Sequence, residues 1–498
     1  MLSIERKSLK SLAALALFTF AFLGSEFFFD RRMGTLLPAE GVVGAQALIL
    51  GASVVGFLAF AALSKLPRAQ AWAQEQQRVG PLLQHSKLPR AQAWAPFTET
   101  AGAIACLIAV LMLDDATALQ VAGCAGFFFL GCAGAEAHWS MARAFEGSPS
   151  LAKGAGSAYA AGILLQFANN QFIPTGAWEV AMLCAGAAAL GALLFFTRDD
   201  ANAERHGENA CTSENANTTT SPSTTENVQP LNRALWSVAL VAILACLFST
   251  LDGVTTLSDA QGSIAVDEWP RLFLAASGLV AGIVFDIRER RYMGFVMFGV
   301  MLLSIISILA VEAGASPVIG LIVFFFSSGF FVTFFTTMFL QLAPRMRTPQ
   351  LWAGMGRAAN NVCAFTISGA SLALTQAGVV AVMIASIVLF MLASTAFIGA
   401  GLFRLPPTAR EREVTEAGLA AESAPSAEEL QAEFIARYGL TPRETDVLRA
   451  VACDERPLKQ IADDLGISLR MVQRHLTNIY EKTDTQTRTG LTKEFMGK

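Results

Sequence analysis

The chain has 498 residues, of which 53% are hydrophobic and only 15% are charged. Soluble domains carry about 25% charged residues, so this composition excludes an ordinary soluble protein and favours a membrane protein. The net charge of -4 indicates no particular partner, because local charge decides what binds. The eight Cys and four His follow no metal-ligand spacing. Since no nucleophile–base grouping or phosphate loop occurs either, we expect no enzyme activity, no catalytic residues, no metal and no cofactor.

Twelve apolar segments have about the 20 residues that a helix needs to cross the bilayer core. The first follows Arg6, Lys7 and Lys10, and no small-residue cleavage site follows it, so we interpret it as a spanning helix. These segments predict an all-α, polytopic membrane domain. They lie near residues 11–29, 41–63, 97–113, 118–140, 154–172, 178–196, 233–251, 270–287, 292–311, 317–340, 352–374 and 378–403.

Basic residues are concentrated in alternate loops. If the N-terminus is inside, the inside segments hold nearly all Lys and Arg, and the outside segments hold only Arg31, Arg32 and Arg271. Lys and Arg gather in cytoplasmic loops of membrane proteins. The asymmetry predicts a multi-pass protein of the cell's inner (cytoplasmic) membrane with both termini in the cytoplasm.

Two polar segments divide the chain. Residues 197–232 are rich in Thr, Asn and Ser, cannot bury a core and are predicted to be disordered. They separate six predicted helices at 1–196 from six at 233–403. A linker at 404–430 then leads to a soluble domain at 431–498. The decamer SKLPRAQAWA occurs at 64–73 and again at 86–95, which indicates a duplicated loop insertion that the fold tolerates.

Polar residues in the fifth and eleventh predicted spans share one face of each helix. Polar groups within the bilayer are costly and often functional, so we expect these residues to contact an unidentified small-molecule ligand. The alternatives are hydrogen bonds between helices or, for Arg357, extension to the cytoplasmic surface. The residues are Tyr159, Gln166 and Asn170 in the fifth span, and Arg357, Asn360 and Asn361 in the eleventh. Further candidates are Glu26, Glu136 and His138, and Glu136 is also a candidate partner of Arg357.

The eighth span closes with GIVFDIRERR at residues 282–291. This segment resembles the major facilitator signature G-x-x-x-D-R-x-G-R-R/K, which that family carries after its second and eighth helices. It departs at Ile287 and Glu289, and no copy is recognisable after the second span. Gly282 permits close helix approach, and Asp286 is placed to pair with an Arg or a helix N-terminus. The resemblance implies a major-facilitator-like domain of two six-helix halves, in which the fifth and eleventh helices are equivalent.

The last sixty residues predict four short helices. Thr441, Pro442 and Glu444 begin the first one as an N-cap, an N1 proline and a capping-box acid. The second helix covers about 457–465 and ends in a turn at Gly466, the third begins at Ser468, and the fourth lies near 486–496. From residue 468 onward six Lys or Arg face three acidic residues. This basic face is typical of a helix that contacts DNA phosphates.

The segment 440–491 resembles the LuxR/GerE-type helix-turn-helix. Its LTPRETDVL, IADDLGIS and VQRHLTNIYEK match the family patterns L-T-x-R-E-x-x-V-L, I-A-x-x-L-x-I-S and V-x-x-H-x-x-N-I-Y-x-K. Met471 and Gln473 depart from the usual T-V-K, so a phosphate-facing Lys is lost and Gln473 is suited to an adenine edge. The resemblance implies a homodimer on double-stranded DNA. The predicted DNA contacts are Lys459, Ser468, Arg470, Met471, Gln473, Arg474, Thr477 and Lys482.

Together, the two resemblances imply a bacterial membrane-bound LuxR-type transcriptional regulator, whose membrane domain senses a small molecule and whose tail binds promoter DNA. One alternative is a major-facilitator-type transporter with a regulatory DNA-binding tail, which requires proton-coupling residues such as Glu26 or Glu136. Measured uptake separates these two. Another alternative is an interaction protein whose tail binds a second regulator, which weak DNA binding by the tail would favour.

Overall fold

The computed structural model describes residues 2–64, 95–214, 231–260, 270–403, 427–453 and 456–496. Within these residues every regular element is a helix, as the all-α prediction requires. The chain divides into two compact units, Met1–Pro406 and Pro407–Lys498. Most of the repeated decamer and the linker from residue 404 to residue 426 lie outside the described residues.

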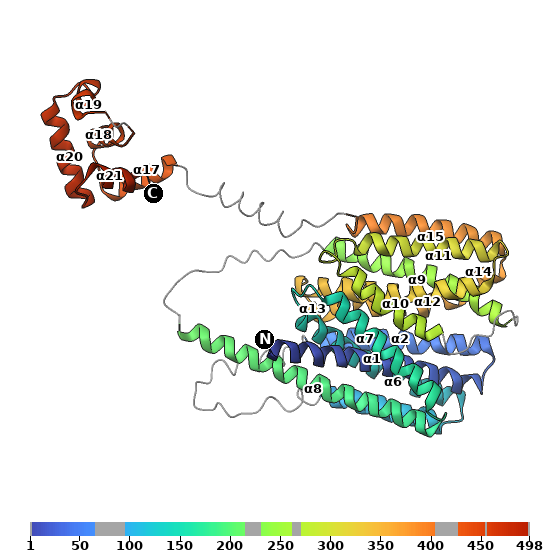
Figure 1. Cartoon of the computed structure of the whole chain (residues 1–498). Coiled ribbons are helices and arrows are strands. Elements are labelled where there is room, and N and C mark those ends of the chain that lie inside the picture. The colour runs from blue at the N-terminus through green and yellow to red at the C-terminus, as the bar shows by residue number, and fades with distance from the viewer. Residues whose placement is uncertain are drawn as a thin grey trace, which may run out of the picture. The chain divides into compact units, whose positions relative to one another are not determined.

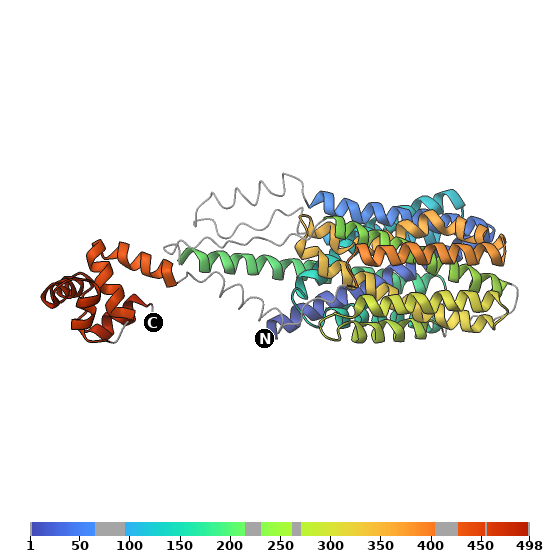
Figure 2. The same ribbon diagram turned by 90° about the horizontal axis from the view of Figure 1, so that it is seen from above.

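Among the described residues, twelve long helices build the first unit and run along a common axis (Figures 1 and 2). The first six are α1 (Leu2–Gly34), α2 (Ala39–Leu63), α5 (Ala95–Met112), α6 (Ala116–Ala144), α7 (Leu151–Phe172) and α8 (Ala177–Glu214). The second six are α9 (Leu231–Ala260), α10 (Pro270–Phe285), α11 (Met293–Glu312), α12 (Pro317–Leu342), α14 (Met355–Gln376) and α15 (Val379–Gly399). The short helices η2 (Ala343–Arg345) and α13 (Pro349–Ala353) join α12 to α14.

The two sets of six helices share one pattern of contacts. In the first set α1 packs on α6, α7 and α8, and in the second set α9 packs on α12, α14 and α15. In the same way α6 contacts α2 and α5, and α12 contacts α10 and α11. The sets meet through α7 against α10 and through α2 against α14, which are equivalent pairs. The structure therefore confirms two six-helix halves in which the fifth and eleventh predicted spans, α7 and α14, correspond.

Among the described residues, nine helices are long and apolar enough to cross a membrane by length and composition. The three other long helices are α7, α10 and α14, and all three lie where the halves meet. A helix that faces protein on two sides needs a smaller lipid-facing surface, so it accommodates polar residues that an outer helix would exclude. The outer surface is apolar, with side chains such as Val380 exposed by 70% and Val121 by 65%.

The contact between α7 and α10 explains why residues 282–291 resemble the major facilitator signature. Both oxygens of Asp286 accept backbone N–H groups at the start of α7, from Ala152 at 3.1 Å and from Lys153 at 2.7 Å. Arg290 donates to Asp286 at 3.1 Å. A Cβ atom added to Gly282 would lie 2.6 Å from the Ala152 carbonyl oxygen, so only glycine permits this approach. Both predicted roles are confirmed, because Asp286 pairs with an Arg and also with a helix N-terminus.

Two predicted boundaries were wrong. The segment predicted to be disordered from 197 is helical as far as Glu214, as an extension of α8. Elongating an existing helix avoids the cost of nucleation, and the extension is rich in Ala and Glu and contains no Pro. Likewise α9 continues to Ala260, beyond the predicted end of this span at residue 251. The start of α1 and the extension of α8 lie at the same end of the helical bundle (Figures 1 and 2).

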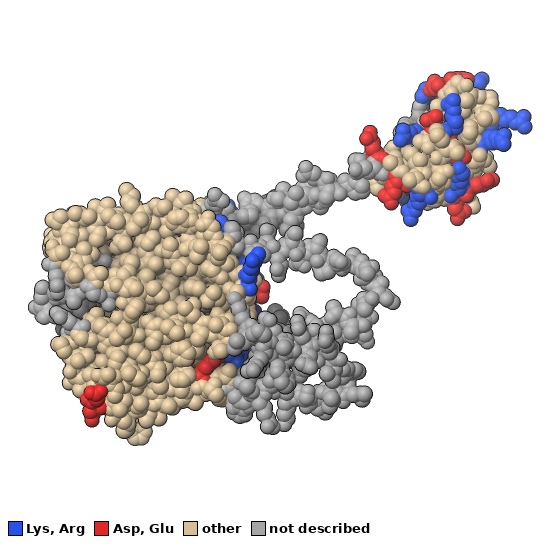
Figure 3. All heavy atoms as spheres, turned by 180° about the vertical axis from the view of Figure 1, so that it is seen from behind, with Lys and Arg blue, Asp and Glu red and all other residues tan. Residues whose placement is uncertain are grey.

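The described residues of the second unit form five short helices around one core. They are α17 (Ala427–Arg437), α18 (Pro442–Cys453), α19 (Leu458–Asp464), α20 (Leu469–Thr483) and α21 (Arg488–Phe495). The last four match the four predicted helices. In Figure 3, the visible face of this unit is rich in charged side chains, whereas the visible face of the first unit is almost free of them.

Candidate functional sites

The core of the second unit holds α20 by one of its faces. Val472, Leu476 and Ile479 of α20 are buried in a cluster with apolar side chains of the other four helices. Gly466, with φ at +63°, makes the turn between α19 and α20, a left-handed conformation that favours glycine. The hydroxyl of Ser468 then accepts the Met471 N–H at 3.3 Å as the N-cap of α20. These features fix the orientation of α20 relative to the core.

The opposite face of α20 is exposed and basic. Arg470, Met471, Gln473, Arg474 and Thr477 are all exposed on it. Within the described residues, the Arg470, Gln473 and Arg474 side chains make no hydrogen bond or ion pair, so their donors are available to a ligand. Five of the predicted DNA contacts therefore lie on one face of one helix.

The three other predicted DNA contacts lie elsewhere or already have partners. Ser468 caps α20, and a hydroxyl in this position can still reach a phosphate. Lys459 is exposed on α19. The ammonium of Lys482 donates to Glu444 at 2.7 Å and to the Gly439 carbonyl at 3.2 Å, so it ties α20 to the start of α18. A DNA contact by Lys482 stays a prediction, and this side chain has a structural role besides it.

Glu444 is the buried partner in the ion pair with Lys482. It accepts hydrogen bonds from the Thr441 N–H at 2.8 Å and from the Thr441 hydroxyl at 3.0 Å, which confirms the capping box. Burial alone would raise the pKa of Glu444, but the hydrogen bonds from Lys482 and Thr441 outweigh it and lower the pKa from 4.5 to about 2. The sequence predicted the cap but missed the ion pair, because Lys482 lies 38 residues further along the chain.

The predicted ligand residues of α7 lie near α1 and α10. The Gln166 amide donates to the Leu23 carbonyl of α1 at 3.1 Å. In the orientation that satisfies its neighbours, the Asn170 amide accepts from Arg271 of α10 at 2.6 Å. Tyr159 is buried. For Gln166 and Asn170, the alternative of hydrogen bonding between helices is thus realised in this structure.

The predicted ligand residues of α14 divide into two kinds. Asn361 is buried and donates to the Ser53 hydroxyl of α2 at 2.9 Å, which joins the two halves. Asn360 is half-buried and donates only to Asn361, at 3.4 Å. Arg357 is 8% exposed, and its Nε has no hydrogen-bond partner among the described residues. Extension of Arg357 to the cytoplasmic surface is therefore excluded by this structure.

Arg357 lies between the halves. Its guanidinium carbon is 5.9 Å from the ring centre of Phe22 on α1 and 5.5 Å from that of Phe335 on α12. It also interacts electrostatically with Tyr159 and Glu26. A buried guanidinium with an unsatisfied N–H is costly, so this side chain is the strongest candidate for an anionic ligand group in the unit.

Glu136 and His138 of α6 are engaged within the first half. Both oxygens of Glu136 pair with Arg198 of α8, one of them with Nη2 at 2.6 Å. Arg357 is not the partner of Glu136, so that candidate pairing was wrong. His138 Nδ1 is 2.7 Å from the Gly134 carbonyl oxygen, and its ring packs edge-on against Phe18. Both residues therefore have structural partners.

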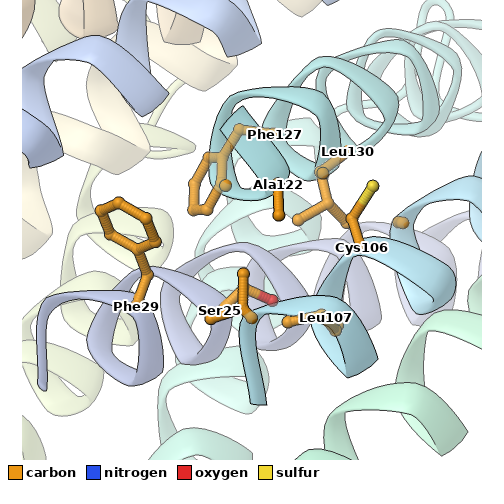
Figure 4. Close-up of a pocket in the computed structure, with 11 residues that line it drawn as sticks. Ser25, Phe29, Cys106, Leu107, Ala122, Phe127 and Leu130 are labelled. Atoms are coloured by element: carbon orange, nitrogen blue, oxygen red, sulfur yellow. The ribbon is translucent and has the colours of Figure 1, made fainter. Parts of the chain in front are cut away.

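A small pocket lies between α1, α5 and α6 (Figure 4). Its volume is about 10 Å³, and Ser25 supplies its only hydroxyl beside apolar residues such as Phe29 and Leu107. A buried water needs about 10–15 Å³ and two to four polar partners. The pocket offers too few partners and contains none of the predicted ligand residues, so we interpret it as a packing defect.

Sequence reasoning missed two polar residues next to Glu26, namely Asp30 on α1 and Gln46 on α2. The Gln46 amide donates to Glu26 at 3.0 Å and to Asp30 at 2.9 Å. The spacing of Glu26 and Asp30, four residues apart on a helix, could have revealed the pair. Among the described residues no group of three or more His, Cys, Asp or Glu is placed to hold a metal.

Comparison with known proteins identifies the second unit. Residues 439–495 match the family model described as "Bacterial regulatory proteins, luxR family". This match confirms the predicted LuxR-type helix-turn-helix, a DNA-binding domain. The helix α17 precedes the matched residues. A comparison with curated proteins finds no match.

Solved transporters are similar to the chain over the membrane unit. The human organic anion transporter TETRAN is 13% identical, with a TM-score of 0.48, over 80% of this chain and 99% of that one. FucP, a Major Facilitator Superfamily transporter in the outward conformation, is 12% identical, with a TM-score of 0.48, over 79% and 97%. A bacterial homologue of the iron transporter ferroportin in an outward-facing state is 14% identical, with a TM-score of 0.49, over 79% and 99%.

Proposed function

We propose that the chain is a membrane-embedded one-component transcriptional regulator, in which the membrane unit senses a small molecule and the LuxR-type domain binds promoter DNA. One observation carries this proposal. The exposed basic face of α20 belongs to a separate unit of a chain whose larger unit has an apolar outer surface. A DNA-binding domain that is attached to a membrane unit has a clear role if the membrane unit controls its binding to DNA.

The ligand contacts the halves where they meet. The helices α7 and α14 carry the predicted ligand residues, and each packs against a helix of the opposite half. A ligand held there alters the relative stability of two arrangements of the halves. It can do so only to the extent that it binds one arrangement more tightly than the other. The altered arrangement changes the exposure or pairing of the DNA-binding domain, which acts as a homodimer on DNA.

The chain lies in the inner membrane with both termini in the cytoplasm. The distribution of Lys and Arg supports this orientation, and so does the position of the start of α1 and the extension of α8 at one end of the bundle. A cytoplasmic reporter fused after residue 215 or 410, and a periplasmic reporter fused after residue 260, should be active. Activity of the opposite reporter at any of these positions would overturn the orientation.

The regulatory role is tested with a reporter gene under the promoters adjacent to this gene, in cells that make the full-length chain. We expect transcription to depend on the chain and to respond to one member of a library of small molecules. The variants Asn170→Ala and Asn360→Ala should keep membrane insertion and DNA binding but lose that response. If both variants respond like the wild type, the ligand binds elsewhere and these residues only connect helices.

The second candidate is a transporter with a regulatory DNA-binding tail. The carboxylates of Glu26 and Asp30 within the membrane unit favour it, because proton-coupled transport requires such groups. Uptake or efflux by vesicles that contain the full-length chain, lost in the variant Glu26→Gln, would support this candidate.

A further inference from the structure

Met471 is an exposed apolar side chain on the basic face of α20. It is 41% exposed and lies outside the apolar cluster that the described residues of the second unit form, whereas the next residue, Val472, is buried in that cluster. Arg474 lies three residues further on, so it neighbours Met471 on the helix surface. Packing within the domain therefore does not account for an apolar side chain at this position.

Met471 also lies in the first turn of α20. The helix begins at Leu469, directly after the N-cap Ser468, so Met471 is its third residue. In a helix-turn-helix the second helix lies in the major groove, and the residues near its N-terminus contact the base edges. The side chain of Met471 is therefore placed to reach a base edge when α20 binds DNA.

The major groove presents one apolar group, the 5-methyl group of thymine, among hydrogen-bond donors and acceptors. The thioether of Met471 donates no hydrogen bond, whereas the Thr of the family pattern T-V-K carries a hydroxyl. A hydroxyl is suited to a phosphate oxygen, and the flexible, polarisable Met side chain is suited to an apolar surface. The residue at this position therefore favours contact with a methyl group over contact with a phosphate.

We propose that Met471 contacts the 5-methyl group of a thymine and makes the domain select thymine at that position of the promoter site. The inference rests on the proposed function, because it requires α20 to bind promoter DNA. Side chains three residues apart on a helix have Cβ atoms about 5–6 Å apart, and base pairs stack about 3.4 Å apart. The thymine should therefore lie about one or two base pairs from the base that Arg474 contacts.

The test compares thymine with deoxyuridine, which pairs with adenine in the same way but lacks the methyl group. The purified full-length protein in detergent is titrated with the site that it protects in the promoter next to its gene. Each thymine of that site is replaced by deoxyuridine in turn. For the wild type, we expect the affinity to fall roughly fourfold at one thymine of each half-site, the loss expected for one buried methyl group.

Two variants make the result specific. Met471→Ala should abolish the difference between thymine and deoxyuridine, and it should bind both DNAs about as tightly as the wild type binds the deoxyuridine DNA. Because Met471 is exposed, the domain should stay folded. Leu469→Ala is the matched control, since Leu469 is 38% exposed and lies two residues away, on the other side of α20. This variant should keep the difference.

The inference is overturned if no thymine shows the difference in the wild type, if Met471→Ala retains it, or if Leu469→Ala also loses it. Equal weakening of both DNAs by Met471→Ala would assign the side chain to the sugar-phosphate backbone and would also contradict the inference. A chain that binds no promoter DNA would contradict the proposed function itself. A chain that binds thymine and deoxyuridine DNA equally well would contradict only the role of Met471.

Discussion

The two units of the chain place their polar residues in opposite ways. In the DNA-binding unit the core is apolar, and the side chains of Arg470 and Arg474 are exposed without protein partners. In the membrane unit the outer surface is apolar, and polar side chains such as Gln166 and Asn361 are buried between helices. In the first unit, the exposed polar side chains form the predicted DNA-binding face. In the second unit, the buried polar side chains hydrogen-bond between helices.

The largest effect should come from the buried face of α20. Ile479 is fully buried, so Ile479→Ala should lower the free energy of unfolding of residues 407–498 by about 2–5 kcal/mol. Thr477→Ala, on the exposed face, should change it by less than about 0.5 kcal/mol. Denaturant unfolding measures both. Equal effects of the two substitutions would mean that α20 does not have two distinct faces.

Glu444 should make the stability of the DNA-binding unit depend on pH. Its folded-state pKa of about 2 lies below the ordinary 4.5, so its contribution is complete above pH 4.5 and is lost as the pH falls toward 2. The shift corresponds to about 3 kcal/mol. Glu444→Gln should make the free energy of unfolding less dependent on pH in this range. Asp446→Asn, at an exposed position, should leave that dependence unchanged. Unfolding measured between pH 2 and pH 6 tests this difference.

The exposed face of α20 should control DNA binding and leave folding intact. Arg470→Ala and Arg474→Ala together should weaken binding to the native promoter by about 1–3 kcal/mol for each side chain that reads a base. Arg443→Ala removes an exposed Arg from α18 and serves as the control. Binding titrations at two salt concentrations give the affinity and its salt dependence. Unchanged affinity in the double variant would remove this face from DNA recognition.

The smallest effect concerns the buried polar residues of the membrane unit. Asn361→Ala breaks a hydrogen bond between α14 and α2 and should cost about 0.6 kcal/mol, the average for hydrogen bonds between membrane helices. Asn360→Ala breaks only a bond to its neighbour and should cost less. Thermal unfolding in detergent compares the two variants. A greater loss of stability in Asn360→Ala than in Asn361→Ala would mean that Asn360 has a stronger interaction than its hydrogen bond to Asn361.

The sequence predicted more of the DNA-binding unit than of the membrane unit. The capping box at Thr441, the turn at Gly466 and the buried stripe of α20 depend on local patterns, and the structure contains each of them. Among the described residues, nine of the twelve long helices of the membrane unit are long and apolar enough to follow from length and composition alone, whereas α7, α10 and α14 are not. The partners of Arg357 and Glu136 did not follow, because they depend on contacts between helices far apart in the sequence. The extension of α8 was missed because polar composition was interpreted as disorder.

A chain held in the membrane should bind specific promoters under the control of its membrane unit. Genome-wide DNA occupancy of the full-length chain tests this most directly, in the wild type, in Arg470→Ala with Arg474→Ala, and in Arg357→Gln. We predict occupancy of a small set of promoters by the wild type, its loss in the double variant, and a changed level at the same promoters in Arg357→Gln. Absence of promoter-specific occupancy, or equal occupancy in all three proteins, would contradict the account.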